Sequence, residues 1–287
     1  MTRSFFPEAG SCRGKARRKK GEPDKELASG DGGSMCGRFT LTIPDATTIA
    51  DALGAFVAPE VAAAWRPRFN VAPTDAHVVA RPGPDGRLEL VAATWGLVPH
   101  WSKDAKAAAR AINARSESAR TAPMFRDAFA RRRCLVPADG FYEWTGEKAA
   151  RKPLWFHAPD GGLVTFAGLT SSWVDPAGAR HRTFTILTTR ANDVVAPAHD
   201  RMPVVLAASD RAAWLAAEPA DAAALMKPAP AGALAVRAVS RRVNQVANDD
   251  PTLLEPEADA PPPQSNNLSL FGPETVVAPL AARKKRR

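Results

Sequence analysis

The sequence predicts an α+β fold with strongly curved, mostly antiparallel sheets and a few short helices. Three observations support this prediction. Short apolar runs bounded by Gly, Pro, Asn and Asp recur between residues 35 and 251. Few segments with helical periodicity lie between them, which disfavours a parallel doubly wound sheet. Hydrophobic residues make up 45% of the chain, enough to bury a substantial core.

The expected elements follow one another along residues 35–251. Strands show short apolar runs, hairpins show two such runs around a Gly- or Pro-containing turn, and helices show apolar residues at helical spacing. Ser209 is expected to cap the last helix. The expected strands are 36–42, 133–144, 182–189, 202–207 and 232–240. The expected hairpins are 76–99 and 153–170, the second turning at Asp160-Gly161-Gly162, and the expected helices are 44–56, 122–132 and 209–218.

The two ends of the chain differ in composition from its middle. Residues 1–34 lack apolar periodicity and are rich in charge, Gly and Ser, and residues 252–287 contain "PPP", "QSNN" and a terminal "RKKRR". Such segments bury too little apolar surface to offset the entropy of ordering. We therefore expect one globular domain at 35–251, a disordered leader at 1–34 and a disordered tail at 252–287.

The charge of the chain favours an anionic partner. The formal net charge is +9 and the isoelectric point is near 9.9, with +3 on residues 1–34, +5 on 35–251 and +1 on 252–287. The domain itself is therefore basic, which favours nucleic acid over a membrane surface as the partner.

The cysteines predict the compartment. Cys12, Cys36 and Cys134 form neither a disulfide framework nor a metal-binding pair, so we expect a reducing cytoplasm. No run of eighteen apolar residues predicts a membrane span.

Four residues are candidates for chemistry, each with a plainer alternative. Cys36 opens a strand, although free cysteines are usually buried, as we expect for Cys134. Glu143 lies among aromatic residues in "DGFYEW", where a carboxyl group can act as a general acid; the alternative is a solvated strand residue. His199 in "PAHDRMP" suits proton transfer or is simply exposed. Asn113 orients a substrate or caps a helix.

Six motifs occur in a fixed order: "MCGRF" (35–39), "RFNVAPT" (68–74), "WGLVPHW" (95–101), "INARSES" (112–118), "CLVPADGFYEW" (134–144) and "HDRMP" (199–203). This order resembles the SOS response-associated peptidase (SRAP) family of abasic-site-processing proteins over roughly residues 35–250. The resemblance implies a compact α+β domain with barrel-like strands and a basic cleft. It also implies a cytoplasmic, monomeric protein that crosslinks covalently to abasic sites in single-stranded DNA and needs no cofactor or metal.

The resemblance also implies roles for individual residues. Cys36 is the expected nucleophile, with Asn113, Glu143 and His199 as further active-site residues. Trp95 or Trp101 is expected to stack on the base next to the lesion; the alternative for either is packing in the core, which we favour for Trp95. The residues expected to line the DNA cleft are Arg38, Asn70, Pro73, Trp101, Arg115 and Arg201.

The implied chemistry requires Cys36 to be the first residue. A primary amine attacks the ring-opened aldehyde of an abasic site to give a Schiff base. The thiol of the same residue then closes a thiazolidine ring, whereas an internal Cys36 has only an amide nitrogen. Either translation starts at Met35 and methionine is removed, which we favour, or the protein cleaves itself with Cys36, Glu143 and His199. β-Elimination of the DNA strand is a further expectation for His199.

Two other functions remain open: a thiol protease with a Cys36–His199 pair oriented by Glu143, and a non-catalytic binder of modified DNA.

The tail adds an expectation about partners. Its apolar residues Leu268, Leu270 and Phe271 have no core to join and resemble the peptide by which bacterial proteins bind the DNA-polymerase sliding clamp. The alternative is an accidental apolar cluster.

Overall fold

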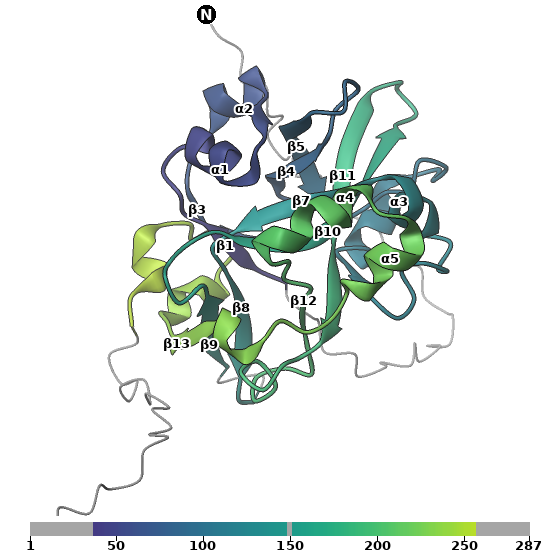
Figure 1. Ribbon diagram of the computed structural model, residues 1–287. Helices are drawn as coiled ribbons and strands as arrows, with labels where there is room; N and C mark the ends of the chain where they lie inside the picture. Colours follow the sequence, from purple (N-terminus) through teal and green to yellow (C-terminus); the bar gives the residue numbers. More distant parts are fainter. Residues whose placement is uncertain (1–36, 148–150, 257–287) are drawn as a thin grey trace, which may run out of the picture. The chain divides into compact units, whose positions relative to one another are not determined.

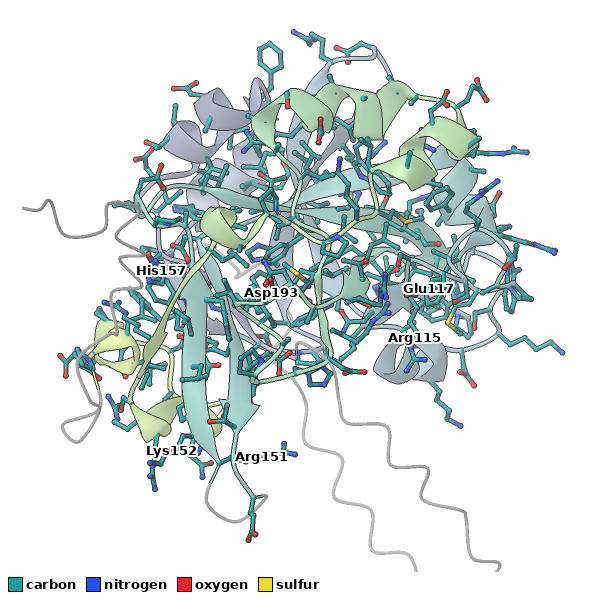
Figure 2. All side chains as sticks on the ribbon, turned by 60° about the horizontal axis from the view of Figure 1, so that its bottom comes forward. Arg115, Glu117, Arg151, Lys152, His157 and Asp193 are labelled. Carbon is teal, nitrogen blue, oxygen red and sulfur yellow. The ribbon has the colours of Figure 1, made fainter. Side chains whose placement is uncertain are left out.

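Two β-sheets form the centre of the α+β fold that the computed structural model describes for residues 37–147 and 151–256 (Figure 1). The first is antiparallel throughout, in the order β13–β9–β8–β1–β3. Its strands are β1 (Phe39–Leu41), β3 (Arg68–Val71), β8 (Gly140–Thr145), β9 (Lys152–His157) and β13 (Ala235–Ala238). β8 and β9 form a long hairpin, toward whose tip Arg151 and Lys152 lie (Figure 2).

The second sheet closes on itself. Its strands are β2 (Phe56–Val57), β4 (Ala76–Pro82), β5 (Leu88–Trp95), β6 (Asn113–Arg115), β7 (Arg133–Ala138), β10 (Val164–Val174), β11 (Arg180–Arg190) and β12 (Arg201–Pro203). β5, β4, β7, β10 and β11 pair in succession, and β11 then pairs with β5 in parallel, Phe184 opposite Trp95. This circuit is a five-stranded mixed barrel, which confirms the expected α+β fold with barrel-like strands.

The barrel strands divide their side chains between two hydrophobic clusters because successive residues of a strand point to opposite faces. One cluster contains Trp95, Cys134, Phe166 and Phe184, contributed by four barrel strands. The other contains alternate residues of the same strands and side chains of the helices, including Trp214. The helices are α1 (Ala46–Leu53), α2 (Pro59–Ala64), α3 (Arg126–Arg131), α4 (Arg211–Ala216) and α5 (Pro219–Ala224). The 3₁₀ segments are η1 (Ala105–Arg110), η2 (Ala208–Asp210), η3 (Ala231–Ala233), η4 (Arg241–Asn244) and η5 (Pro251–Leu254).

Three sequence predictions about local structure are wrong. The strand expected at 133–144 is broken at Asp139 into β7 and β8, which belong to different sheets. The Asp139 carboxylate accepts hydrogen bonds from the Thr40 hydroxyl and from the backbone N–H and hydroxyl of Thr42, and so fixes the break. Residues 153–170 are not a hairpin either, because β9 pairs with β8 and β13 whereas β10 pairs with β7 and β11.

The third error concerns a helix cap. Asp210, not Ser209, is the N-cap of α4, and the Ser209 hydroxyl donates to the Asp210 carboxylate at 3.3 Å. The helix expected at 44–56 is confirmed as α1. Asp45 caps it by accepting from the Thr48 N–H at 2.7 Å, and Gly54 ends it in the left-handed conformation with φ 65°.

Several predictions fall on residues 1–36 and 257–287, outside the described part of the chain. They include the leader, Cys36 and the tail residues Leu268, Leu270 and Phe271. Within residues 37–147 and 151–256, no helix has the length and apolar character to cross a membrane.

Candidate functional site

One end of the barrel gathers three predicted site residues. β11 pairs there with β6 and with β12, which places Arg115 opposite Thr188 and Arg201 opposite Arg190. Asn113 opens β6 and is not a helix cap. Sequence segments more than eighty residues apart thus meet at the C-terminal end of β11.

Arg201 is held in place at this end by a carboxylate. Its guanidinium donates two hydrogen bonds to Glu117, at 2.6 and 2.8 Å, and one to the Thr188 carbonyl oxygen at 2.8 Å. Arg201 is 8% exposed, whereas the Glu117 side chain is 56% exposed. The hydrogen bond from Arg201 lowers the pKa of Glu117 to about 2. Figure 2 shows Glu117 beside Arg115, which is exposed.

His199 is oriented by its own loop. Its Nδ1 accepts a hydrogen bond from the backbone N–H of Arg201 at 3.0 Å and lies 3.0 Å from a carboxylate oxygen of Asp200. The contact with the Arg201 N–H calls for a lone pair on Nδ1, whereas the contact with the Asp200 carboxylate calls for a proton there, so Nδ1 is held by its loop in either tautomer. The side chain is 17% exposed, so the imidazole is mostly enclosed but not sealed from solvent.

Glu143 lies beside the first described residues. β1 pairs with β8 so that Phe39 faces Phe141, and the backbone N–H of Tyr142 donates to the Arg38 carbonyl oxygen at 3.0 Å. This register, continued by one residue, sets Gly37 opposite Glu143. Glu143 is 3% exposed, which rules out the alternative of a solvated strand residue.

Aromatic packing connects this part of the site to Asn113. The rings of Phe39 and Trp95 meet edge to face with centroids 5.0 Å apart. Trp95 Nε1 donates to the carbonyl oxygen of Ile112 at 2.8 Å, and Asn113 is the next residue. Trp95 is fully buried, which confirms the expectation that it belongs to the core.

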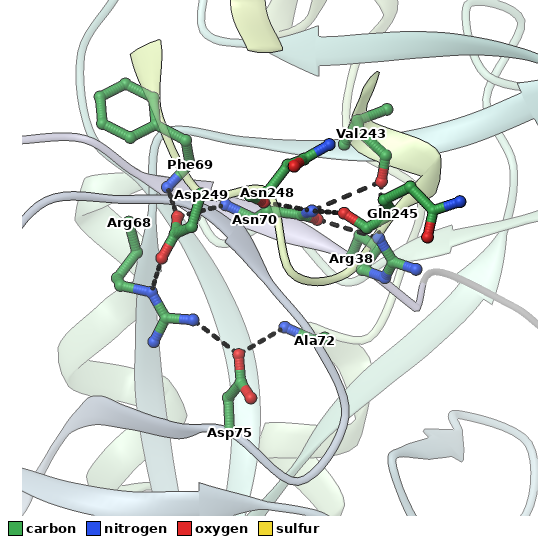
Figure 3. A network of polar contacts seen from close by, with 10 residues as sticks. All are labelled: Arg38, Arg68, Phe69, Asn70, Ala72, Asp75, Val243, Gln245, Asn248 and Asp249. Atoms are coloured by element: carbon green, nitrogen blue, oxygen red, sulfur yellow. Dashed lines mark hydrogen bonds and ion pairs between the residues drawn. The ribbon is translucent and has the colours of Figure 1, made fainter. Parts of the chain in front are cut away.

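Arg38 belongs to a network that ties β1 and β3 to residues 243–249 (Figure 3). It donates to the Asn70 side-chain oxygen at 3.0 Å and to the Val243 carbonyl oxygen at 2.8 Å. The Asn70 amide in turn donates to the Asn248 carbonyl oxygen at 2.8 Å. Asn70 is fully buried, so here its side chain positions Arg38 and does not reach the surface.

The same network has a second half, which sequence reasoning missed. Asp249 accepts from Arg68 at 2.5 Å and from the backbone N–H groups of Phe69 and Asn70 at 2.6 and 3.0 Å. Arg68 also pairs with Asp75 at 2.6 Å. These contacts hold residues 243–249 against β3, which keeps Arg38 in position.

The remaining predicted DNA-binding residues are Pro73 and Trp101. Pro73 is half-buried in the turn before β4, next to Thr74, whose φ of 74° is an uncommon conformation for a β-branched residue. Trp101 is 57% exposed. Glu117 and Thr74 were not singled out from the sequence, although both lie within the motifs quoted above.

The described residues contain one cysteine, Cys134. It is fully buried in β7, as expected, and burial raises the pKa of its thiol above the usual range. No group of three or more His, Cys, Asp or Glu side chains able to hold a metal ion occurs within residues 37–147 and 151–256.

The fold and site define a barrel-centred α+β protein with a buried glutamate in its first sheet, a partly buried histidine, and arginines at one end of its barrel. The chain belongs to the SRAP family, because the model of that family, described as SOS response associated peptidase, matches residues 35–246. The abasic site processing protein YoqW of Bacillus subtilis is 35% identical over 230 residues, covering 77% of this chain and 99% of its own.

Two further comparisons agree with this assignment. The abasic site processing protein HMCES of Gallus gallus is 30% identical over 225 residues, covering 67% of each chain. A crystal structure of a protein from Bacteroides thetaiotaomicron matches with a TM-score of 0.71 at 24% identity, covering 77% of this chain and all of that one. This last comparison supports the fold alone.

Proposed function

We propose that this protein recognises abasic sites in single-stranded DNA and forms a covalent bond with them through Cys36. The family membership carries the proposal, together with relatives named abasic site processing proteins. The geometry adds support: Cys36 directly precedes Gly37, whose place in the strand register is opposite the buried Glu143. The basic charge of the domain suits a DNA partner.

The proposed reaction joins one aldehyde to one aminothiol. The amine of an N-terminal Cys36 attacks the aldehyde carbon, and loss of one water molecule gives an imine. The thiol then adds to the imine carbon while the nitrogen takes up the thiol proton. The product is a five-membered thiazolidine, and no oxidant or reductant is needed.

Glu143 is the proposed acid and base of this sequence. It protonates the ring oxygen as the sugar opens and the departing hydroxyl as the imine forms. His199 assists proton transfer in imine formation, in its reversal or in β-elimination of the DNA strand. Asn113 holds the sugar or the backbone of Cys36.

The arginines and Trp101 are proposed to hold the DNA. Arg38 and the exposed Arg115 bind phosphates next to the lesion, and Asn70 acts by positioning Arg38. Arg201 shapes the same edge while paired with Glu117. Pro73 lines the cleft, and the exposed Trp101 stacks on a base, a contact worth about 1–3 kcal/mol.

This mechanism requires removal of residues 1–35. Translation from Met35 followed by methionine removal is the route we favour, and cleavage by Cys36 with Glu143 and His199 is the alternative. Both routes give a protein that begins at Cys36. The intact mass of the protein from its native host therefore distinguishes them only if the mass of the precursor is also measured over time. A precursor beginning at Met1 that shortens in a purified sample establishes self-cleavage.

Incubation with oligonucleotides that carry one abasic site tests the proposed function. We expect a shifted band that survives heat and denaturant, and none with an oligonucleotide lacking the lesion. A band that denaturant abolishes supports the non-catalytic binder. Absence of any band, together with cleavage of protein substrates, supports the thiol protease.

We also propose that the protein works in the cytoplasm as a monomer during the DNA-damage response, and that its tail binds the sliding clamp. Leu268, Leu270 and Phe271 supply the apolar contacts, and tethering would raise the local concentration at DNA. A peptide spanning 262–273 should bind the clamp weakly, and Ala at Leu270 and Phe271 should abolish this binding. A wild-type peptide that does not bind refutes the tail proposal alone.

A further inference from the structure

A basic cavity of about 310 Å³ lies at the opposite end of the barrel from the candidate site. It forms where β4 ends, β7 and β11 begin and β10 approaches its end. β11 runs from the cavity to the site, and Arg182 is six residues before Thr188, about 20 Å at about 3.3 Å per residue. The arginines that line the cavity are Arg81, Arg131, Arg132, Arg133, Arg180 and Arg182.

The cavity has more guanidinium groups than carboxylates that form ion pairs with them. Among the described residues, their ion pairs are made with Glu89, which binds Arg81 at 3.0 Å, and with Asp127, which binds Arg131 and Arg132. Arg182 donates to the carbonyl oxygen of Ala92 at 3.2 Å. Burial lowers the pKa of Arg182 and the nearby charge of Arg81 lowers it further, while the charges of Glu89 and Glu60 act in the opposite direction.

Hydroxyl side chains provide a second observation. Ser172 pairs with Arg182 across β10 and β11, so the two side chains lie on the same face of the sheet, and Ser172 accepts a hydrogen bond from Arg180 at 3.2 Å. Thr170 is two residues away on the same face of β10, and both residues line the cavity. An oxyanion in the cavity can accept a hydrogen bond from the Ser172 hydroxyl.

We propose that this cavity binds a phosphate group. A guanidinium fork matches phosphate geometry, and the surplus positive charge favours an anion over a neutral ligand. Arg133 is the fixed base of the cavity, since it donates to the carbonyl oxygens of Phe129 and Trp214 at 2.8 and 2.5 Å. Arg182, Arg180 and Ser172 make the proposed contacts. The phosphate belongs either to a DNA strand that extends beyond the candidate site or to a free phosphate compound.

Calorimetric titration of the full chain with inorganic pyrophosphate tests the cavity without any DNA reaction. We expect saturable binding that Arg182→Gln weakens about tenfold, or about 1.4 kcal/mol. Ser172→Ala should weaken it about threefold, because it removes the hydroxyl on the same face as Arg182. Arg87→Gln is the matched control: it removes the same charge from an exposed turn outside the cavity.

Two lesion-free oligonucleotides distinguish the sources. A strand that keeps the stacked spacing of about 3.4 Å per nucleotide needs about six nucleotides to reach from the site to the cavity. If DNA supplies the phosphate, Arg182→Gln weakens binding of a 20-mer but not of a 4-mer. If a free compound supplies it, only pyrophosphate binding falls. If Arg182→Gln and Arg87→Gln affect pyrophosphate and the 20-mer equally, or wild type binds neither, the proposal is wrong. Crosslinking to abasic DNA is not used, so its failure would not decide the result.

Discussion

Glu117 holds Arg201 by two hydrogen bonds of 2.6 and 2.8 Å, so a surface carboxylate neutralises a buried guanidinium next to His199. This pair fixes the backbone of Arg201, and that backbone in turn orients His199, because the N–H of Arg201 donates a hydrogen bond to His199 Nδ1.

Glu117→Gln should therefore destabilise the protein by about 1–3 kcal/mol, because it removes the charge that compensates a buried guanidinium. Urea denaturation at neutral pH measures the change. Asp85→Asn is the control: its pair with Arg87 is exposed to solvent, so its loss should change the stability much less. Equal effects of the two substitutions would show that burial of Arg201 does not strengthen its pair.

Glu143→Gln should slow crosslinking by about 10²- to 10⁴-fold and change DNA affinity little, because it removes a proton donor while keeping the shape of the side chain. Single-turnover crosslinking rates and fluorescence anisotropy measure the two quantities. Glu147→Gln, on the exposed continuation of β8, should leave both unchanged. An equal loss of rate and affinity in Glu143→Gln would assign Glu143 to DNA binding.

His77 should make the protein sensitive to acid. It is buried against the carbonyl oxygen of Pro137, and burial lowers its pKa from 6.5 to about 3. Between these values the unfolded chain binds a proton that the folded chain does not, so stability falls as pH falls, by about 1.4 kcal/mol per pH unit.

His77→Gln keeps a donor toward Pro137 but binds no proton, so this part of the pH dependence should disappear. Urea unfolding at pH 6.5, 5.5 and 4.5 measures the slope. His100→Gln is the control, because the His100 side chain is 52% exposed. A slope unchanged by His77→Gln would show that His77 is protonated in the folded protein.

Cys134→Ser should leave crosslinking intact and lower stability by about 1–3 kcal/mol, because a hydroxyl would replace a thiol in a fully buried position. Crosslinking yield and thermal unfolding measure the two effects, with Cys134→Ala as the variant that adds no polar atom. Loss of crosslinking in folded Cys134→Ser would give this thiol a part in the reaction.

Local sequence patterns predicted which helices and strands form better than they predicted which strands pair with one another. The helix around Ile49, the core position of Trp95 and the burial of Cys134 follow from periodicity and neighbouring residues. The parallel pairing of Phe184 with Trp95, which closes the barrel, joins residues almost ninety positions apart and leaves no local signal. The break at Asp139 likewise depends on hydrogen bonds from a distant strand.

The same limit applies to the site. Asn113, Glu143 and His199 stood out because their side chains can transfer protons or form hydrogen bonds. The resemblance to the SRAP family then assigned all three to one site. Glu117 was overlooked because a glutamate among polar residues looks like any solvated side chain, and its importance comes from a partner on another strand.

The central claim is that the free amine and thiol of Cys36 together form the bond to DNA. Two proteins test it: one that begins at Cys36, and one that retains residues 1–35 with no cleavage. Both are mixed with an oligonucleotide carrying one abasic site, and the denatured products are weighed by mass spectrometry. We expect, for the first protein only, a conjugate whose mass is that of protein plus oligonucleotide minus one water. The same conjugate formed at the same rate by the protein with its leader intact would contradict it.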